Sequence, residues 1–274
     1  MTSQSFIKMH ALGNDFVIMD AREKAISLTN DQVQFLANRN RGIGCDQVIL
    51  LQQSPKADLF MRIFNADGGE VEACGNAARC IGLLLIEKEG RQEAVIETKA
   101  GLLRCTSPGN NQITVDMGIP RLDWEGIPLA KKQDTLNLDI KVASLKNPVA
   151  VNMGNPHAVF LVSDCSSVDL QQLGPILETN SMFPERANIS IAEIVDTENI
   201  RLRVWERGVG ITLACGTAAC ATLVAANLRG VMGREANVLL DGGSLHICWQ
   251  KDGRVMMTGP ATTSFSGSLE WERM

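Results

Sequence analysis

No tyrosine occurs in the 274 residues, and aromatic side chains account for only 4% of them. A hydrophobic core must therefore be built from Leu, Ile, Val, Ala and Met. No basic run is present and the net charge is −5, which argues against nucleic acid or an anionic membrane as the main partner. No apolar stretch reaches ~18 residues, and residues 1–10 lack the pattern of a secretory signal. These absences predict a cytoplasmic protein that does not act at a membrane.

Metal and disulfide chemistry also lack support in the sequence. No Cys-x-x-Cys pair occurs, and the three histidines are scattered, at His10, His157 and His246. No metal site is therefore expected. The chain has eight cysteines, but it is long enough to fold without disulfides and shows no sign of secretion. We expect free thiols, most of which pack in the core, including Cys45, Cys80 and Cys220.

Two cysteines stand apart because each opens a similar segment. Residues 73–80 read ACGNAARC, residues 214–221 read ACGTAACA, and apolar sequence of helical composition follows each of them. A cysteine just before a helix start faces unpaired backbone N–H groups and the positive end of the helix dipole. This position predicts a lowered pKa and an accessible thiolate for both Cys74 and Cys215.

The two cysteines belong to a repeat that extends well beyond these segments. They are 141 residues apart, and the same offset joins other polar and glycine positions. These pairs are Asn14 with Asn155, Gln47 with Asn188, Asn65 with Glu206, and Gly118 with Gly259. Self-similarity at so long a period, in two copies, indicates a duplicated domain and not a solenoid. Duplicated folds also keep equivalent turns for structural reasons, and a single matched asparagine can be explained in that way.

The first copy shows a plausible set of secondary-structure elements. A helical pattern covers residues 28–38, with Thr29 or Asn30 as its N-cap. Strands are expected at residues 6–20 around a polar break at 13–15, and at residues 48–51, 59–64, 94–98, 102–106 and 112–117. The length of the chain suits two domains of about 130 residues each.

Two helix N-termini from two similar halves suggest one site between them. The α-carboxylate of an amino acid would be held there by backbone N–H groups, with Cys74 and Cys215 on opposite faces of the α-carbon. One thiolate then removes the α-proton and the other thiol returns a proton from the opposite side, which inverts the centre. No lysine lies in either motif to form a Schiff base, so pyridoxal phosphate is not required and no cofactor is expected.

Several segments, in chain order, resemble the diaminopimelate epimerase family. They are residues 8–16, 64–68, 153–157 and 206–208, together with the two Cys-Gly motifs. The resemblance implies a cofactor-independent enzyme that interconverts L,L- and meso-diaminopimelate on the route to lysine and peptidoglycan. It implies an α+β fold of two pseudo-symmetric domains, each a curved, mostly antiparallel sheet around a central helix, with the active site in the cleft between them. It also implies a homodimer, and domains formed by residues 1–117 plus 263–274 and by residues 118–262.

The resemblance assigns roles to single residues. Cys74 matches the proton donor in the L,L to meso direction, and Cys215 matches the acceptor. The family's substrate-binding amides are matched by Asn14, Gln47, Asn65, Asn155 and Asn188. The helix-start residues that hold the reacting carboxylate are matched by Gly75, Asn76, Gly216 and Thr217. Glu206 and Arg207 match a Glu-Arg pair, in which the arginine can bind a carboxylate. His157 and Glu206 match side chains that support the thiols.

The chain departs from many members of that family at Ala77 and Ala218, where glycine is common. The change is the same in both halves, and alanine favours a helix by up to ~1 kcal/mol over glycine, so we expect no effect on the chemistry.

Three other readings remain open. The nearest is a proline racemase or hydroxyproline epimerase, although those enzymes typically carry histidine where this chain has Asn76. The second is a thiol redox protein that uses a Cys74–Cys215 disulfide. The third is an amino-acid-binding protein without activity, against which the presence of both cysteines and of the Glu206–Arg207 pair argues.

Overall fold

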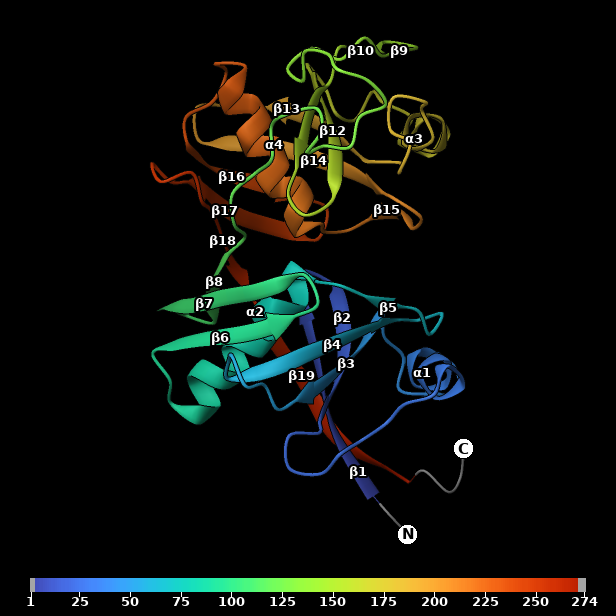
Figure 1. The fold of residues 1–274 in the computed structure, drawn as a ribbon, viewed down its shortest axis with the longest axis vertical. Helices are drawn as coiled ribbons and strands as arrows, with labels where there is room; N and C mark the ends of the chain where they lie inside the picture. Colours follow the sequence, from blue (N-terminus) through green and yellow to red (C-terminus); the bar gives the residue numbers. More distant parts are fainter. Residues whose placement is uncertain (1–2, 271–274) are drawn as a thin grey trace. The chain divides into compact units, whose positions relative to one another are not determined.

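The computed structural model describes residues 3–270 (Figure 1). The chain divides into two compact units. Unit 1 comprises Met1–Val115 with Gly259–Met274, and unit 2 comprises Asp116–Thr258. The last four residues of the segment assigned by resemblance to the first domain, 271–274, lie outside the described residues. No helix within residues 3–270 is long and apolar enough to cross a membrane.

Unit 1 is built on one sheet whose strands pair mostly antiparallel. Its strands are β1 (Ser3–Ala11), β2 (Asn14–Asp20), β3 (Gln47–Gln52), β4 (Leu59–Asn65), β5 (Glu70–Val71), β6 (Glu93–Thr98), β7 (Gly101–Gly109), β8 (Gln112–Asp116) and β19 (Thr262–Glu270). β1 pairs with β19 on one side and with β2 on the other. Two pairs are parallel, β2 with β3 and β4 with β6. Parallel neighbours need a long crossover, and the helices of the unit lie in these connections.

Helices cover both faces of this sheet. α1 (Asn30–Ala37) begins at the N-cap Thr29, whose side chain and that of Gln32 form a capping box. Its buried face packs against alternate residues of β2 and β3, including Val17 and Val48. α2 (Gly75–Leu83), continued by the π-helix η1 (Leu84–Lys88), packs against β1, β6 and β7. Because both faces are covered, β3 is apolar at four consecutive positions, as buried strands are.

Unit 2 repeats this arrangement. Its strands are β11 (Val149–Asn152), β12 (Pro156–Val162), β13 (Asn188–Ile194), β14 (Asn199–Glu206), β15 (Gly210–Thr212), β16 (Glu235–Leu240), β17 (Gly243–Trp249) and β18 (Val255–Pro260). A short hairpin, β9 (Lys141–Val142) with β10 (Leu145–Lys146), precedes them. α3 (Leu170–Glu178) lies in the crossover between the parallel strands β12 and β13. α4 (Gly216–Leu228) is the helix that follows the second Cys-Gly motif.

The duplication is visible in the strand register itself. Phe16 pairs with Gln47 in unit 1, and His157 pairs with Asn188 in unit 2, each residue 141 positions after its counterpart. The parallel pair β4 with β6 recurs as β14 with β16. The expected α+β fold, with two similar units and a mostly antiparallel sheet in each, is therefore confirmed.

The burial of the central helices α2 and α4 explains why both are rich in apolar residues. α4 has apolar residues on all sides and packs against six strands of its unit, and ten of its residues are buried. A helix that is apolar all round must be enclosed, because any exposed face would leave hydrophobic area in water. Residues 76–83 of α2 are buried in the same way.

Candidate active site

Cys74 is the N-cap residue of α2. Its backbone is extended, with φ −149° and ψ 113°, and its Sγ accepts a hydrogen bond from the N–H of Ala77 at 3.5 Å. Gly75 is the first helical residue, so N–H groups of the first turn lack intrahelical partners. The helix behind the thiol is buried, which fixes the thiol at the positive end of the helix dipole.

The Asn14 side chain faces this thiol. Its Oδ1 accepts a hydrogen bond from Nδ2 of Asn76 at 3.1 Å and a longer one from Cys74 Sγ at 3.9 Å. Asn14 is the first residue of β2, and Asn76 lies in the first turn of α2. The structure thus brings three predicted site residues together at one corner of unit 1.

Gln47 and Asn65 form a second amide pair in unit 1. They are register partners at the start of β3 and the end of β4, and Gln47 Nε2 donates to Asn65 Oδ1 at 2.9 Å. The other atom of the Gln47 amide, Oε1, is buried and meets no hydrogen-bond donor within residues 3–270. A buried acceptor without a donor is costly, so this oxygen is well suited to receive a donor from a ligand.

Cys215 is the N-cap residue of α4, and Gly216 begins the helix. The thiol is buried and lies 3.5 Å from the Thr217 hydroxyl. Burial first, and then the negative charge of Glu206, raise the pKa of Cys215 well above its ordinary value, against smaller effects of hydrogen bonds from Thr217 and Ala218. The lowered pKa predicted from the helix N-terminus is therefore wrong for Cys215, because desolvation outweighs the dipole.

Glu206 is the acidic partner of this thiol. It ends β14, and its carboxylate is hydrogen-bonded to the Cys215 side chain and accepts a hydrogen bond from the Thr212 hydroxyl. A carboxylate that accepts a hydrogen bond from a thiol can take up the thiol's proton. Unit 1 has a neutral amide, Asn65, at the corresponding position, where it accepts a hydrogen bond from Gln47.

His157 is buried in unit 2 and is neutral. Its Nε2 lies 2.8 Å from Asn155 Oδ1. Burial, with a smaller effect of the positive charge of Arg207, lowers the pKa of His157 to about 3. Nε2 is then the donor to Asn155, and Nδ1 is a buried acceptor that no donor reaches within the described part of the chain. His157 therefore cannot serve as an imidazolium acid near neutral pH in this structure.

Both polar atoms of the Asn188 side-chain amide form hydrogen bonds with backbone groups. Its Nδ2 donates to the Pro156 carbonyl at 3.2 Å, and its Oδ1 accepts from the Arg207 N–H at 2.9 Å. These bonds join the starts of β12 and β13 to the turn after β14. The Arg207 side chain is exposed, and its Nη1 donates to the Glu185 carbonyl at 2.9 Å. The substrate-binding roles of Asn188 and Arg207 stay predictions.

Sequence reasoning missed Glu178, the last residue of α3. Its buried carboxylate accepts hydrogen bonds from Trp205 Nε1 at 2.7 Å and from the Gly208 N–H at 3.0 Å. It therefore holds the chain on both sides of the Glu206–Arg207 pair. One signal was present, since an acidic residue in the last turn of a helix opposes the helix dipole and calls for a compensating contact.

The other cysteines behave as core residues. Cys45, Cys80 and Cys220 are buried, as expected. Burial raises the pKa of Cys45 to about 11 and that of Cys80 to about 12, so neither thiol ionises readily. All eight cysteines of the chain are free thiols. Of the two remaining histidines, His246 lies exposed on β17, with Nδ1 3.2 Å from Asn237 Oδ1.

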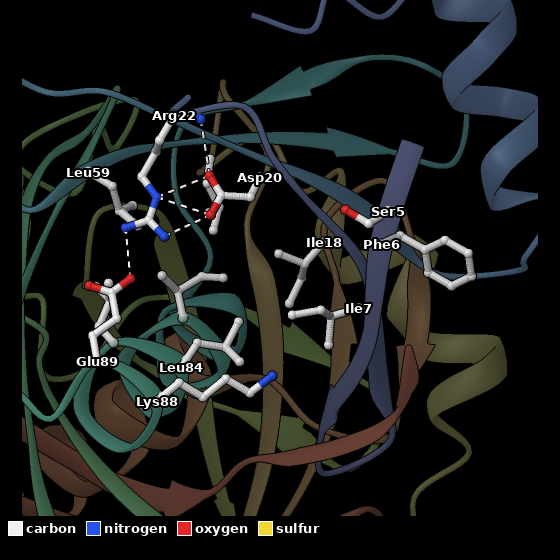
Figure 2. A pocket seen from close by; sticks show the side chains of 13 residues that line it. Ser5, Phe6, Ile7, Ile18, Asp20, Arg22, Leu59, Leu84, Lys88 and Glu89 are labelled. Carbon is white, nitrogen blue, oxygen red and sulfur yellow. Dashed lines mark hydrogen bonds and ion pairs between the residues drawn. The ribbon is translucent and has the colours of Figure 1, made fainter. Parts of the chain in front are cut away.

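A pocket of about 170 Å³ lies in unit 1 at the C-terminal end of the central helix (Figure 2). Its floor is aliphatic, and its rim carries Arg22 paired with Asp20 and Glu89 at 2.7 and 2.9 Å. It is lined by residues of η1, about 15 Å along the helix from Cys74 at a rise of ~1.5 Å per residue. No predicted site residue lines it, so this pocket is separate from the thiol corner of unit 1.

Comparison with known proteins gives a consistent result. The sequence profile of the family described as diaminopimelate epimerase matches residues 6–122 and 149–264. A diaminopimelate epimerase of Rhodospirillum centenum is 53% identical over 96% of this chain and 91% of its own length. One of Erythrobacter litoralis is 52% identical over 97% of both chains. A solved hydroxyproline epimerase from Agrobacterium vitis has the same fold, with a TM-score of 0.69 and 15% identity over 97% of this chain and 92% of that one.

Proposed function

The chain belongs to the diaminopimelate epimerase family, and on that premise we propose that it interconverts L,L- and meso-diaminopimelate with two thiols and no cofactor. It is an isomerase of the amino-acid epimerase type. In this proposal Cys215 removes the α-proton of the L,L isomer and Cys74 supplies a proton to the opposite face.

The observation that carries the proposal is the unequal environment of the two thiols. Cys215 donates to a carboxylate, Glu206, whereas Cys74 donates to a neutral amide, Asn14. Glu206 can take the Cys215 proton as substrate displaces water, and the resulting thiolate then accepts the α-proton. Cys74 has no such acceptor in Asn14 and keeps its proton until the carbanion forms.

The proton transfers balance over one turnover. The proton of Cys215 moves to Glu206, the α-proton moves to the Cys215 thiolate, and the Cys74 proton moves to the carbanion. Cys74 is left as the thiolate, and the proton held by Glu206 returns to solvent, from which Cys74 is reprotonated. The reverse reaction exchanges the roles of the two thiols.

Backbone groups support the developing negative charge. The helix starts at Gly75 with Asn76 and at Gly216 with Thr217 offer first-turn N–H groups to the substrate carboxylate. The buried Oε1 of Gln47 suits an ammonium group of the substrate. Asn65 and Asn155 would add further amide contacts, and Arg207 a bidentate contact to the distal carboxylate.

We further propose a cytoplasmic homodimer that works on this small molecule without nucleic acid or membrane partners. The support is the family resemblance together with the net charge of −5. Sedimentation equilibrium of the purified protein tests the assembly, and a monomer at micromolar concentration would contradict that part of the proposal.

Proton NMR of the reduced protein in D₂O tests the reaction. L,L-diaminopimelate should lose its α-proton signal while the meso isomer appears, and Cys74→Ala and Cys215→Ala should each abolish the conversion. Cys80→Ala, which alters a buried core thiol of α2 and not a thiol at a helix start, is the matched control and should retain it.

Proline and trans-4-hydroxyproline are included as competing substrates. Exchange of the α-proton of these compounds and not of diaminopimelate would identify the protein as a proline racemase or hydroxyproline epimerase. No exchange on any substrate, from a fully reduced sample, would refute the enzymatic proposal. The activity of an oxidised sample should be restored by reductant. An oxidised sample whose turnover is the same with and without reductant would contradict the requirement for two free thiols.

A further inference from the structure

A network of charged side chains is attached to the amide nitrogen of Asn14. Asp46 accepts from Asn14 Nδ2 at 3.0 Å and from Arg39 Nη2 at 2.8 Å, through different oxygens. Arg39 also binds Asp15 through two nitrogens, at 3.0 and 2.8 Å, and the buried Lys8 donates to Asp15 at 2.6 Å. The Asp15 N–H donates to Asp46 at 3.1 Å, and the Asp46 N–H to the Asp15 side chain at 2.9 Å. The four charged groups form one connected network.

Two members of this network, Asp15 and Arg39, are held in their charged forms near neutral pH. Burial raises the pKa of Asp15, but hydrogen bonds from Arg39 and Lys8 outweigh it and hold that pKa well below its usual value. The hydrogen bond to Asp15 raises the pKa of Arg39, so the guanidinium stays charged. Arg39 in turn fixes one oxygen of Asp46, which leaves the other oxygen directed at Asn14.

An ionised carboxylate can only accept hydrogen bonds, so the group of Asn14 that faces Asp46 must be its NH₂. The amide oxygen must then face Asn76 and Cys74. We propose that Asp46 is a positioning residue, which fixes the amide orientation of Asn14 so that the Cys74 thiol meets an acceptor and is kept in its protonated, donating form. This inference rests on the role given to Cys74 in the proposed function.

Unit 2 has no counterpart of this network. The positions that correspond to Asp46 and Asp15 are Ala187 and Pro156, and the oxygen of Asn155 is engaged by His157. The carboxylate near Cys215 is Glu206, which contacts the thiol directly. The two units therefore place a carboxylate at different distances from the sulfur: one amide away in unit 1 and adjacent in unit 2.

The test measures the ionisation of Cys74 without any substrate. Iodoacetamide labelling of the peptide that contains Cys74 is followed by mass spectrometry as a function of pH. In Asp46→Asn the new amide can donate as well as accept, so Asn14 is free to turn its NH₂ toward the sulfur and stabilise the thiolate. The pH of half-maximal labelling should fall by about 1 unit. Asp46→Ser, whose hydroxyl also donates and accepts, should shift it in the same direction.

A double-mutant cycle separates positioning from the loss of a nearby charge. In an Asn14→Ala background, Asp46→Asn should shift the midpoint by less than ~0.3 units, because the amide that transmits the effect is gone. Other titratable or charged groups on the elements packed against α2 are unchanged in all four proteins: Lys8 and His10 on β1, Glu93 and Glu97 on β6, Arg104 and Cys105 on β7, Glu87 and Lys88 on η1, with Arg79 and Cys80 on α2 and Glu72 just before it.

Two results would overturn the inference: an unshifted midpoint in a folded Asp46→Asn protein, or a full shift that persists without Asn14. Circular dichroism and thermal melts establish folding, and a misfolded Asp46→Asn leaves Asp46→Ser to decide. Because labelling needs no turnover, the outcome is independent of the activity assay. A wild type that fails to epimerise diaminopimelate would refute the proposed function and leave the amide orientation to be judged by labelling alone.

Discussion

Glu206 occupies in unit 2 the position that Asn65 occupies in unit 1, as the last residue of β14 and of β4 respectively. The duplicated scaffold therefore carries a carboxylate at this position in unit 2 and a neutral amide in unit 1. The negative charge of Glu206 raises the pKa of Cys215, and the neutral Asn65 can make no such contribution in unit 1.

Glu206→Gln should separate ionisation from catalysis. Burial would still raise the pKa of Cys215, but the contribution of the carboxylate charge would be lost, so that pKa should fall relative to the wild type. Turnover should nevertheless drop by ~10²-fold or more, because the acceptor for the thiol proton is gone. Ultraviolet thiolate absorbance against pH, referenced to Cys215→Ala, gives the first quantity and the NMR assay the second. Glu198→Gln, at an exposed loop position, should change neither.

His157 should make folding stability depend on pH. Its folded pKa of about 3 lies below the ~6.5 of an unfolded chain, so between these values only the unfolded state binds the proton. Its contribution to stability is complete above about pH 6.5 and decreases as the pH falls toward 3, by up to ~1.4 kcal/mol per unit. Urea denaturation at about pH 7, 6 and 5 measures this slope. His157→Gln should flatten it, whereas His246→Gln should not, and a flat wild-type profile would contradict the prediction.

Glu178→Gln should impair turnover from outside the reacting groups. The amide keeps one acceptor but cannot serve both Trp205 and Gly208, so the turn that carries Glu206 and Arg207 loses a support. A misplacement of the order of 1 Å can cost up to ~10²-fold in rate, and we expect a loss of kcat of about tenfold. Glu185→Gln is the matched control, because Arg207 contacts only the backbone carbonyl of Glu185. Equal kcat values for the two variants would exclude the positioning role.

Gly82→Ala should destabilise unit 1. A Cβ at this position in α2 would lie 2.9 Å from Cys105 Cβ and 3.1 Å from Ile113 Cγ2, both in the core. Overpacking of this kind costs ~1–3 kcal/mol, which exceeds the ~1 kcal/mol that alanine gains in helix propensity. Gly233→Ala, where the nearest atom is 4.0 Å away, should be neutral or slightly stabilising. Urea denaturation of both variants measures the difference, and a more stable Gly82→Ala would refute the packing argument.

The sequence predicts much of this architecture because the duplication repeats each signal. Thr29 caps its helix with Gln32, and the 141-residue offset is preserved in the strand register that pairs Phe16 with Gln47 and His157 with Asn188. Local rules sufficed for the cap and for the strands themselves, since capping and alternation act within a few residues, whereas the equivalent pairing in the two units follows from the duplication.

The repeat could not predict contacts that are formed in one unit and have no equivalent in the other. Asp46 and Glu178 correspond to Ala187 and Ala37, so the repeat gives no reason to select them. The pKa of Cys215 depends on how fully the fold buries the thiol beside Glu206, which a position at a helix start does not reveal. A pKa that depends on burial in the tertiary structure cannot be predicted from the pattern of residues in the sequence.

Unit 1 is assembled from two distant parts of the sequence, whereas unit 2 is continuous. β1 needs β19 as its second neighbour, and β19 leaves the ribosome only after all of unit 2. At ~5–20 residues per second, one edge of β1 waits on the order of 10–50 s for its partner, while unit 2 can already close. The unpaired backbone groups at an open strand edge can pair with other nascent chains, so we expect β1 to need protection by chaperones during synthesis. Translation of unit 1 therefore begins before that of unit 2 and is completed after it.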